Sequence, residues 1–536
     1  MRGTGRAVAL VAAVTLAVAG LTPAAASAAP DDHTTTGGFR PEPVDWQPCP
    51  ESPGDPAVRC GALTLPIDWS DPGGPTFSLA VARRAATDPA ARRGPLVINP
   101  GGPGGSGVDF TLEAQGHLSP GILKSFDIIG FDPRGVRRSN PVQCSAELAA
   151  QQPFLVPDTE AEYAALLSFN ARFGADCRAR TGPLFDHVDT LSVDRDIDAI
   201  RAALGERQIS YFGISYGTLI GQEYAELFPD RIRAMVVDSN MDHSLGTEPF
   251  LLTEAATDED SFREFIAWCD RDTSCALHGQ DVAAVWTDLM RRADAGTLTV
   301  PGSSTKPTWW DLTRSAISVL YGPNWSTLAN EIALLSTGGS ASSLTAVGQA
   351  VFSGGPAHRF QPGGGPQAPA ELVPNPLAIF CEDWSLPVSG FGQLKRYFDE
   401  SRGVAPLLRT STLGWSASVS CLGWPAKVNN PQHPLRVRAG IPLLVLNAVH
   451  DPATPYAWAL DAAFQLGSHG RLVTYQGWGH GAYGHSDCTA GTVDEYLIDR
   501  TLPAFGATCP AVPPQDPAFR TLAVPVPAPG SLGWTY

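Results

Sequence analysis

Apolar residues recur along this chain in short runs of strand length, separated by longer stretches with helical spacing. The runs are rich in Val, Ile and Leu with few polar interruptions, which is typical of strands buried on both faces of a sheet. They cover residues 95–99, 126–131, 209–212, 234–238, 442–447 and 472–475. Helical spacing lies between most of them, for example over 193–204 and 457–466. This alternation predicts an α/β fold: a mostly parallel sheet flanked by helices on both faces.

Two segments outside this rhythm extend the prediction. Residues 61–67 and 77–84 alternate apolar and polar positions more regularly and predict an antiparallel hairpin at one edge of the sheet. Between residues 238 and 441 no strand-like run continues the series. Helical patterns take its place, at 261–270, 282–293 and 311–320. We therefore expect a mainly helical cap domain inserted into the sheet domain.

A chain of 536 residues is longer than one hydrophobic core usually organises. The composition changes along the chain suggest where it divides. The predicted parts are a signal peptide (1–28), a flexible arm or pro-segment (29–43), the first part of the core (44–243), the cap (244–436), the second part of the core (437–509) and an extended Pro-rich tail (510–536).

The first residues have the pattern of a secretory signal peptide. Arg2 and Arg6 precede an apolar run over 7–20, and small residues follow up to Ala28, where we expect cleavage. No other stretch is long and apolar enough to span a bilayer, so we expect a secreted protein without stable membrane insertion. The net charge of −17 makes binding to nucleic acid unfavourable. The sequence leaves the oligomeric state open.

Ten cysteines in an exported chain indicate disulfides. Pairing of sequence neighbours is our interpretation, although sequence alone does not fix the connectivity. No Cys-x-x-Cys or His-x-x-x-His spacing is present, so the sequence gives little support for a structural metal site, and it implies no cofactor. The expected pairs are 49 with 60, 144 with 177, 269 with 275, 381 with 421, and 488 with 509.

The most informative motif is Gly-Ile-Ser-Tyr-Gly at 213–217, between a predicted strand and a predicted helix. Glycines at both ends allow a sharp strand-to-helix turn that holds a serine in a strained, exposed conformation. Glycine is common in this chain, so the motif could also arise by chance. The flanking strand and helix favour its interpretation as a nucleophile elbow around Ser215.

A serine hydroxyl needs a histidine to accept its proton and a carboxylate to orient that histidine. Asp451 and His480 each follow one of the last two strands of the series, in the chain order Ser, Asp, His that this architecture uses. His485 lies on the same loop as His480 and is the competing base. We prefer His480 because glycines flank it and it follows the strand more closely.

Two backbone amides should complete the site by stabilising an oxyanion. One is the N–H of Tyr216, directly after the serine. The other is expected from the Gly-rich segment 100–107, which follows a buried strand, and our candidate is Gly102. This segment lacks the Gly-Lys-Ser/Thr ending of a phosphate-binding loop.

Five segments together carry a resemblance to a known family, the exported tripeptidyl aminopeptidases of the α/β-hydrolase superfamily, which are relatives of prolyl aminopeptidases. The resemblance implies an α/β-hydrolase fold with a cap, and a Ser215–Asp451–His480 triad with an oxyanion hole from Gly102 and Tyr216. The segments are Asn-Pro-Gly-Gly-Pro-Gly-Gly-Ser-Gly at 99–107, Gly-Phe-Asp-Pro-Arg-Gly at 130–135, Gly-Ile-Ser-Tyr-Gly at 213–217, Asp-Pro-Ala-Thr-Pro at 451–455 and Gly-His-Gly at 479–481.

The same resemblance gives a structural role to Arg134 and points to Cys-Glu-Asp-Trp at 381–384 as part of the cap. An enzyme acting on free N-termini must bind an ammonium group, and Asp383 or Glu382 is the expected anchor, although a solvated acidic pair is an equally good interpretation. The predicted function is a secreted serine exopeptidase that releases short peptides. A secreted esterase with the same triad, acting on small esters, is the first alternative, and a non-catalytic envelope binding protein is the second.

Overall fold

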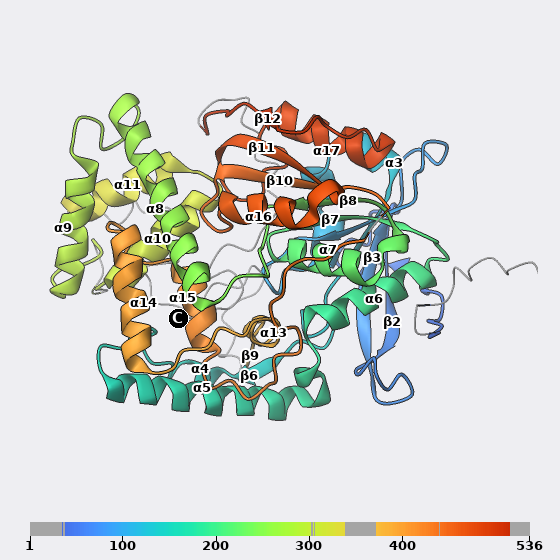
Figure 1. Cartoon of the computed structure of the whole chain (residues 1–536), viewed down its shortest axis with the longest axis horizontal. Coiled ribbons are helices and arrows are strands. Elements are labelled where there is room, and N and C mark those ends of the chain that lie inside the picture. Colours follow the sequence, from blue (N-terminus) through green and yellow to red (C-terminus); the bar gives the residue numbers. More distant parts are fainter. Residues whose placement is uncertain are drawn as a thin grey trace, which may run out of the picture.

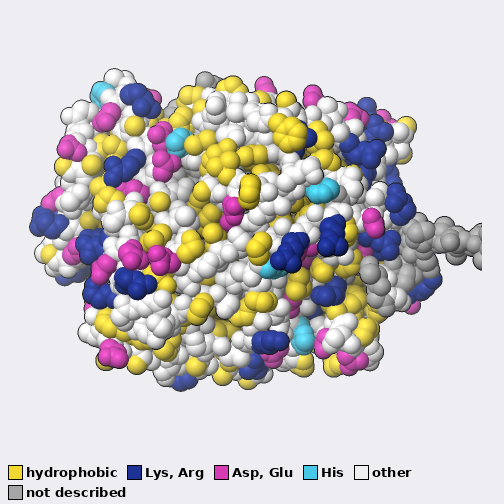
Figure 2. Space-filling view, viewed as in Figure 1, with side chains coloured by type: hydrophobic (Ala, Val, Ile, Leu, Met, Phe, Trp, Pro, Cys, Tyr) yellow, Lys and Arg dark blue, Asp and Glu magenta, His cyan; other side chains and the backbone are white. Residues whose placement is uncertain are grey.

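A computed structural model describes residues 35, 38–301, 304, 306–337, 371–438 and 440–514. The predicted signal peptide, most of the arm and most of the Pro-rich tail lie outside these residues, so those predictions are not tested. Within the described ranges no helix has the length and apolar character needed to cross a membrane. Acidic and basic side chains are distributed over the whole face shown in Figure 2, so the net charge is not gathered there into one patch.

Ten strands form one sheet in the order β1-β2-β3-β5-β4-β7-β8-β10-β11-β12 (Figure 1). From β5 to β12 all neighbouring strands are parallel, and β1, β2 and β3 continue the sheet antiparallel at one end. All six predicted strands and the predicted edge hairpin are present. The strands are β1 (Gln47–Pro48), β2 (Val58–Pro66), β3 (Thr76–Arg84), β4 (Pro95–Asn99), β5 (Asp127–Phe131), β7 (Ile209–Ile214), β8 (Ile232–Asp238), β10 (Leu443–His450), β11 (Gly470–Trp478) and β12 (Ala507–Cys509).

Both faces of the sheet are buried, and consecutive side chains alternate between two apolar clusters. Val97 and Ile129 belong to the cluster under α6 (Thr190–Ala203), α7 (Tyr216–Leu227) and α16 (Tyr456–Leu466). Ile98 and Ile128 belong to the cluster on the opposite face. The helices of that face are α1 (Gly107–Leu112), α2 (Ala114–His117), α3 (Pro120–Ser125) and α17 (Asp487–Asp499).

The region between β8 and β10 is mainly helical, as its sequence pattern predicts, and lies beside the sheet at the left of Figure 1. Its first four helices share an apolar cluster of their own around Phe262, Trp286 and Trp325. The last three pack into the cluster of the α6–α7 face, through Phe380 and Trp415. The helices in the described part of this region are α8 (Thr247–Arg271), α9 (Val282–Asp294), α10 (Trp309–Tyr321), α11 (Trp325–Thr337), α13 (Leu377–Asp383), α14 (Phe391–Val404) and α15 (Thr412–Ser420).

A segment from the first half of the chain joins these inserted helices. The amide of Asn170, on α5 (Glu160–Thr181), donates to the carbonyls of Val419 (3.0 Å) and Leu422 (2.9 Å). Next to it, β6 (Gln143–Ser145), which leads into the short helix α4 (Ala146–Ala149), pairs with β9 (Leu372–Pro374) of the insertion. The sequence pattern did not show α5 because its apolar residues do not gather on one face.

All five disulfides join the sequence neighbours expected from the cysteine spacing. Cys144–Cys177 links β6 to α5, and Cys381–Cys421 links α13 to the end of α15. Two of the five bridges therefore hold together segments that pack with the inserted helices.

Candidate active site

Ser215 lies at a tight turn between β7 and α7, with φ 56° and ψ −126°. Non-glycine residues seldom adopt this region of backbone space, so the turn is strained. The two motif glycines make it possible. A Cβ at Gly213 would lie 2.2 Å from the carbonyl oxygen of Gly217, and one at Gly217 would lie 2.5 Å from the carbonyl oxygen of Asn99. The predicted strained elbow is therefore present, and its glycines are sterically required. The prediction that the serine is exposed is wrong, because Ser215 is buried.

Asp451 and His480, which are far apart in sequence, form a buried hydrogen-bonded pair. The Nδ1 atom of His480 lies 2.9 Å and 3.0 Å from the two carboxylate oxygens of Asp451. Burial raises the pKa of Asp451, but the charge and hydrogen bond of His480, with the N–H of Thr454, outweigh it and hold that pKa below its usual value. An ionised Asp451 keeps the proton of the imidazole on Nδ1. Nε2 of His480 is then the basic atom, and it is buried without a hydrogen-bond partner in the described chain.

Asp238, at the carboxyl end of β8, connects the elbow to the loop that carries His480. Its main-chain oxygen accepts the N–H of Ser215 at 2.9 Å. Its carboxylate accepts the N–H groups of Ala482 (2.9 Å) and Tyr483 (2.8 Å). Burial raises the pKa of Asp238 to about 7, against the opposing effect of these two hydrogen bonds. One residue thus fixes both the serine turn and the histidine loop, a role that sequence reasoning missed.

The Gly-rich segment packs directly on the elbow, as expected for a contributor to an oxyanion hole. A Cβ at Gly101 would lie 2.9 Å from the main-chain nitrogen of Tyr216 and 2.9 Å from Cβ of Ser215. Gly102 follows with φ 116°, a conformation that favours glycine. The structure therefore brings the segment carrying Gly102 next to the N–H of Tyr216.

The competing histidine has a different environment. His485 is buried, with its ring centroid 5.7 Å from that of Tyr475. Burial lowers the pKa of His485 to about 4, so the ring is neutral at ordinary pH. Asp451 is bonded to His480, which makes His480 the candidate base. In the described residues no hydrogen bond joins its Nε2 to the Ser215 hydroxyl.

The two expected ammonium anchors are completely buried, and this corrects their interpretation. The carboxylate of Asp383 accepts the N–H (2.8 Å) and hydroxyl (2.7 Å) of Thr190 and the phenol of Tyr216 (2.6 Å). Glu382 accepts the N–H of Val188 at 3.0 Å. Since neither side chain has exposed surface, a substrate ammonium cannot reach them without rearrangement. Asp383 instead holds the residue that follows the serine.

A different acidic pair lies beside the triad, on α8. The hydroxyl of Thr257 donates to the main-chain oxygen of Asp451 at 2.7 Å, so this face of α8 packs on the acid loop. Glu254 and Asp258 flank Thr257, one helical turn apart, and both are buried. Burial raises the pKa of each well above its usual value, reinforced for Glu254 by Asp451 and for Asp258 by Glu254.

Glu254 also has a carboxylate oxygen, Oε2, without a hydrogen-bond partner in the described residues. Unpaired buried carboxyl oxygens are rare and call for a physical explanation. The available sequence signal was a set of acidic residues, Glu254, Asp258 and Glu259, among the buried positions of a helix that also buries Phe250, Leu251 and Phe262.

Comparison with known proteins supports the same architecture. Residues 94–485 match the protein family described as alpha/beta hydrolase fold. The chain is 32% identical to "Serine protease Hip1" of Mycobacterium tuberculosis, over 87% of this chain and 91% of that protein. It is 30% identical to "Tripeptidyl aminopeptidase" of Streptomyces coelicolor (87% and 86%) and 31% identical to "Carboxylesterase B" of Mycobacterium tuberculosis (87% and 89%).

Proposed function

This chain belongs to the α/β-hydrolase family and is a serine hydrolase, and from that premise we propose that it is a secreted exopeptidase. Its proposed reaction is the release of short peptides, tripeptides in the first instance, from free N-termini. The observation that carries the proposal is the Asp451–His480 pair, whose basic Nε2 is unpartnered and whose loop is anchored on the same residue as the Ser215 turn.

In the proposed mechanism the hydroxyl of Ser215 attacks the scissile carbonyl and passes its proton to Nε2 of His480. Asp451 stabilises the imidazolium that forms. The N–H groups of Tyr216 and Gly102 stabilise the negative charge on the former carbonyl oxygen. His480 then protonates the leaving amine, and an acyl-enzyme remains on Ser215. Water, deprotonated by the same imidazole, releases the peptide.

Recognition of a free N-terminus requires negative charge near the acyl side of the site. We assign this role to Glu254 and Asp258 because they lie on the helix that packs on the Asp451 loop and Glu254 has an unpaired carboxylate oxygen in the described residues. They are as buried as Asp383 and Glu382, so a substrate ammonium reaches them only through a rearrangement of the site. A substrate ammonium would supply the missing donors and favour the ionised carboxylates. The helices between β8 and β10 form the proposed cap, and their bulk would limit how much peptide extends past the site.

The test compares three substrates: a tripeptide anilide with a free N-terminus, its N-acetylated form and a short-chain p-nitrophenyl ester. The free peptide should give the highest kcat/KM, and Ser215→Ala should abolish all three activities. Equal rates on free and acetylated peptide would exclude the aminopeptidase. Preference for the ester would favour the esterase, to which one relative's name, "Carboxylesterase B", points.

A second test addresses the acidic pair. Glu254→Gln should lower kcat/KM on the free tripeptide by roughly 10- to 100-fold, the range expected from losing a hydrogen bond to a charged group, and leave the acetylated substrate little changed. Glu248→Gln, an exposed glutamate on the same helix, is the matched control. If Glu254→Gln lowers both rates equally, Glu254 does not bind the ammonium. Secretion is tested by N-terminal sequencing of protein from the culture medium, which should begin after Ala28.

A further inference from the structure

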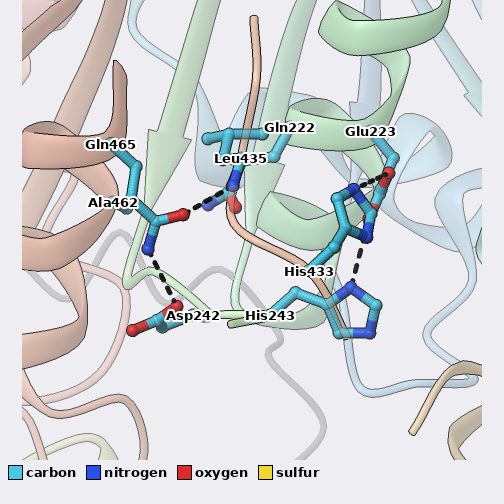
Figure 3. Close-up of a pocket in the computed structure, with 8 residues that line it drawn as sticks. All are labelled: Gln222, Glu223, Asp242, His243, His433, Leu435, Ala462 and Gln465. Carbon is cyan, nitrogen blue, oxygen red and sulfur yellow. Dashed lines mark hydrogen bonds and ion pairs between the residues drawn. The ribbon is translucent and has the colours of Figure 1, made fainter. Parts of the chain in front are cut away.

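A second cluster of ionisable side chains lies toward the C-terminal end of α7, whereas the serine turn is at its N-terminal end. Two glutamates one turn apart on α7, Glu223 and Glu226, meet two histidines from other segments. His243 follows β8, and His433 lies on the segment that leads from α15 back to β10. Figure 3 shows Glu223, His243 and His433 together at one side of a pocket, with Asp242 and Gln465 at the other. Glu223 and His243 are buried, and His433 is partly exposed.

The separations between the ligand atoms are those of a small coordination site. Nδ1 of His243 lies 3.1 Å from Oε1 of Glu223, and Nε2 of His433 lies 3.7 Å from Oε2 of Glu223. Nε2 of His433 also lies 2.9 Å from Oε2 of Glu226. Four ligands at about 2.0 to 2.1 Å from a tetrahedral metal ion would be separated by about 3.3 Å. The ligand atoms of Glu223, His243 and His433 all lie within 4.8 Å of one another, and Glu226 adjoins this group through its contact with His433.

The second nitrogen of each imidazole provides an independent observation. Nε2 of His243 lies 2.7 Å from the main-chain oxygen of Asp383, and Nδ1 of His433 lies 3.3 Å from the main-chain oxygen of Pro431. Carbonyl oxygens only accept, so each of these nitrogens carries a proton. A neutral ring then has its lone pair on the nitrogen that faces the glutamates. Metal-binding histidines are held in the same way, by donation from the far nitrogen to a carbonyl or carboxylate.

We propose that Glu223, Glu226, His243 and His433 form a binding site for a divalent transition metal, with Zn²⁺ as the best match. Two imidazole nitrogens and two carboxylate oxygens form a mixed N/O ligand set of the kind that Zn²⁺ accepts in tetrahedral geometry. Without a cation, each ring faces hydrogen-bond acceptors at both nitrogens, so the cluster needs an added proton on each histidine or a protonated glutamate.

The spacing patterns that indicate a zinc site in sequence do not reveal this one, because the ligands come from three separate segments. A bound cation would tie α7, the loop after β8 and the segment returning from the inserted helices. The proposal does not depend on the peptidase function. It predicts that a bound metal ion stabilises the folded protein and takes no part in the reaction at Ser215.

The experiment uses the tag-free full chain after dialysis against a chelator, titrated with Zn²⁺ by calorimetry and with Co²⁺ by visible absorption. The wild type should bind one equivalent of each, with the intense ligand-field bands of four-coordinate Co²⁺, and the midpoint of thermal unfolding should rise with Zn²⁺. His433→Gln is partly exposed and should fold normally. It should weaken binding by more than the roughly 10- to 100-fold that loss of an outer-sphere partner causes.

His469→Gln changes a histidine of the η4 turn (Gly467–His469), outside the cluster, and should leave both titrations unchanged. Glu226→Gln provides a second removal of a ligand, also at a partly exposed position. The proposal is overturned if the wild type binds no equivalent of either metal. It is also overturned if His433→Gln and Glu226→Gln bind as the wild type does, which would leave a hydrogen-bonded cluster of protonated histidines.

Discussion

Replacement of Asp451 by Asn would change the proton position on the catalytic imidazole with little change in volume. One carboxylate oxygen, Oδ1, accepts the N–H groups of Ala453 (2.9 Å) and Thr454 (3.0 Å) and faces Nδ1 of His480 at 2.9 Å. The other, Oδ2, accepts the Thr454 hydroxyl at 2.9 Å and lies 3.0 Å from the same Nδ1. The two main-chain donors require the amide oxygen of the new Asn at Oδ1, so its NH₂ group takes the place of Oδ2.

That NH₂ group is a donor about as close to Nδ1 of His480 as the amide oxygen, which already accepts two main-chain N–H groups. It therefore favours the imidazole with its proton on Nε2, the atom that must accept the proton of Ser215. When the triad aspartate of a serine protease is replaced by asparagine, the histidine adopts the wrong tautomer and kcat falls by about 10⁴-fold. We expect a loss of that order here, which corresponds to about 5 kcal/mol of transition-state stabilisation at about 1.4 kcal/mol per factor of ten.

The assay is kcat on the free tripeptide anilide near neutral pH, with stability followed by denaturant unfolding. Asp260→Asn is the matched control, because Asp260 makes a similar Asp–His contact, 2.7 Å from Nδ1 of His450, on the same side of the molecule but outside the triad. It should change kcat less than about threefold. If Asp451→Asn retains more than about a tenth of wild-type kcat while Ser215→Ala is inactive, Asp451 does not set the tautomer of His480 and the assignment of the acid is wrong.

Three further predictions follow from single contacts. Gly101→Ala would place a Cβ 2.3 Å from the carbonyl oxygen of Ile214, at a residue with φ +84°. The clash should displace the Gly-rich segment 100–107, so kcat should fall by about 10²-fold. Gly296→Ala is the control, because Gly296 also has positive φ but open space around it, and it should leave kcat unchanged. Asp383 has a folded-state pKa of about 7, raised chiefly by burial and secondly by Asp189. The native state therefore holds this proton more tightly than the unfolded state, and the carboxyl lowers the free energy of unfolding by up to roughly 4 kcal/mol as pH rises from about 4 to about 7. In Asp383→Asn, the free energy of unfolding measured in urea should decline less steeply over that pH range. An unchanged pH dependence would contradict the reasoning. Arg134 is buried and donates to the carboxylate of Asp196 at 2.7 Å and 2.6 Å and to three main-chain carbonyls. Arg134→Met should therefore lower the free energy of unfolding by about 3 to 5 kcal/mol, because it leaves a buried carboxylate without its partner. A loss below about 1 kcal/mol in denaturant unfolding would contradict the structural role assigned to this arginine.

The sheet could be predicted because both of its faces are buried. Continuous apolar runs such as those of β4 and β10 leave few alternatives in an alternating α/β pattern. The helix α5 could not be found in the same way. Its buried residues Tyr163 and Leu166 join the same apolar cluster as the sheet and the last inserted helices, but Asn170 and Gly174 are buried with them, so its sequence lacks an apolar stripe. Elements that pack against several partners lose the periodicity on which sequence reasoning depends.

The triad candidates could be named because each follows a strand end, and the order of strands brings those ends together. Asp383 was assigned to the substrate because the resemblance places Cys-Glu-Asp-Trp in the cap and a free N-terminus needs a carboxylate. Sequence does not show that α13 turns this carboxylate toward Thr190 and Tyr216, where hydrogen-bond donors already occupy it. The contacts of a buried carboxyl depend on tertiary packing, so no local pattern distinguishes an anchor for substrate from an anchor for the protein itself.

Four buried carboxyls around the site, Asp238, Asp383, Glu254 and Asp258, have raised pKa values, yet they differ in what stabilises their ionised forms. Asp238 and Asp383 each accept two or more donors from the protein, so their charge is already compensated and they hold main chain and side chains in place. Glu254 lacks such donors at one oxygen, as does Glu382, but Glu254 lies on the helix that packs on the Asp451 loop. A cation that binds beside Glu254 would donate to this free oxygen without displacing a hydrogen bond of the protein. At Asp238 and Asp383 it would have to compete with donors that are already bound. For that reason an ammonium group near the triad should bind at α8, and the activity ratio between free and acetylated peptides should depend on Glu254 rather than on Asp383.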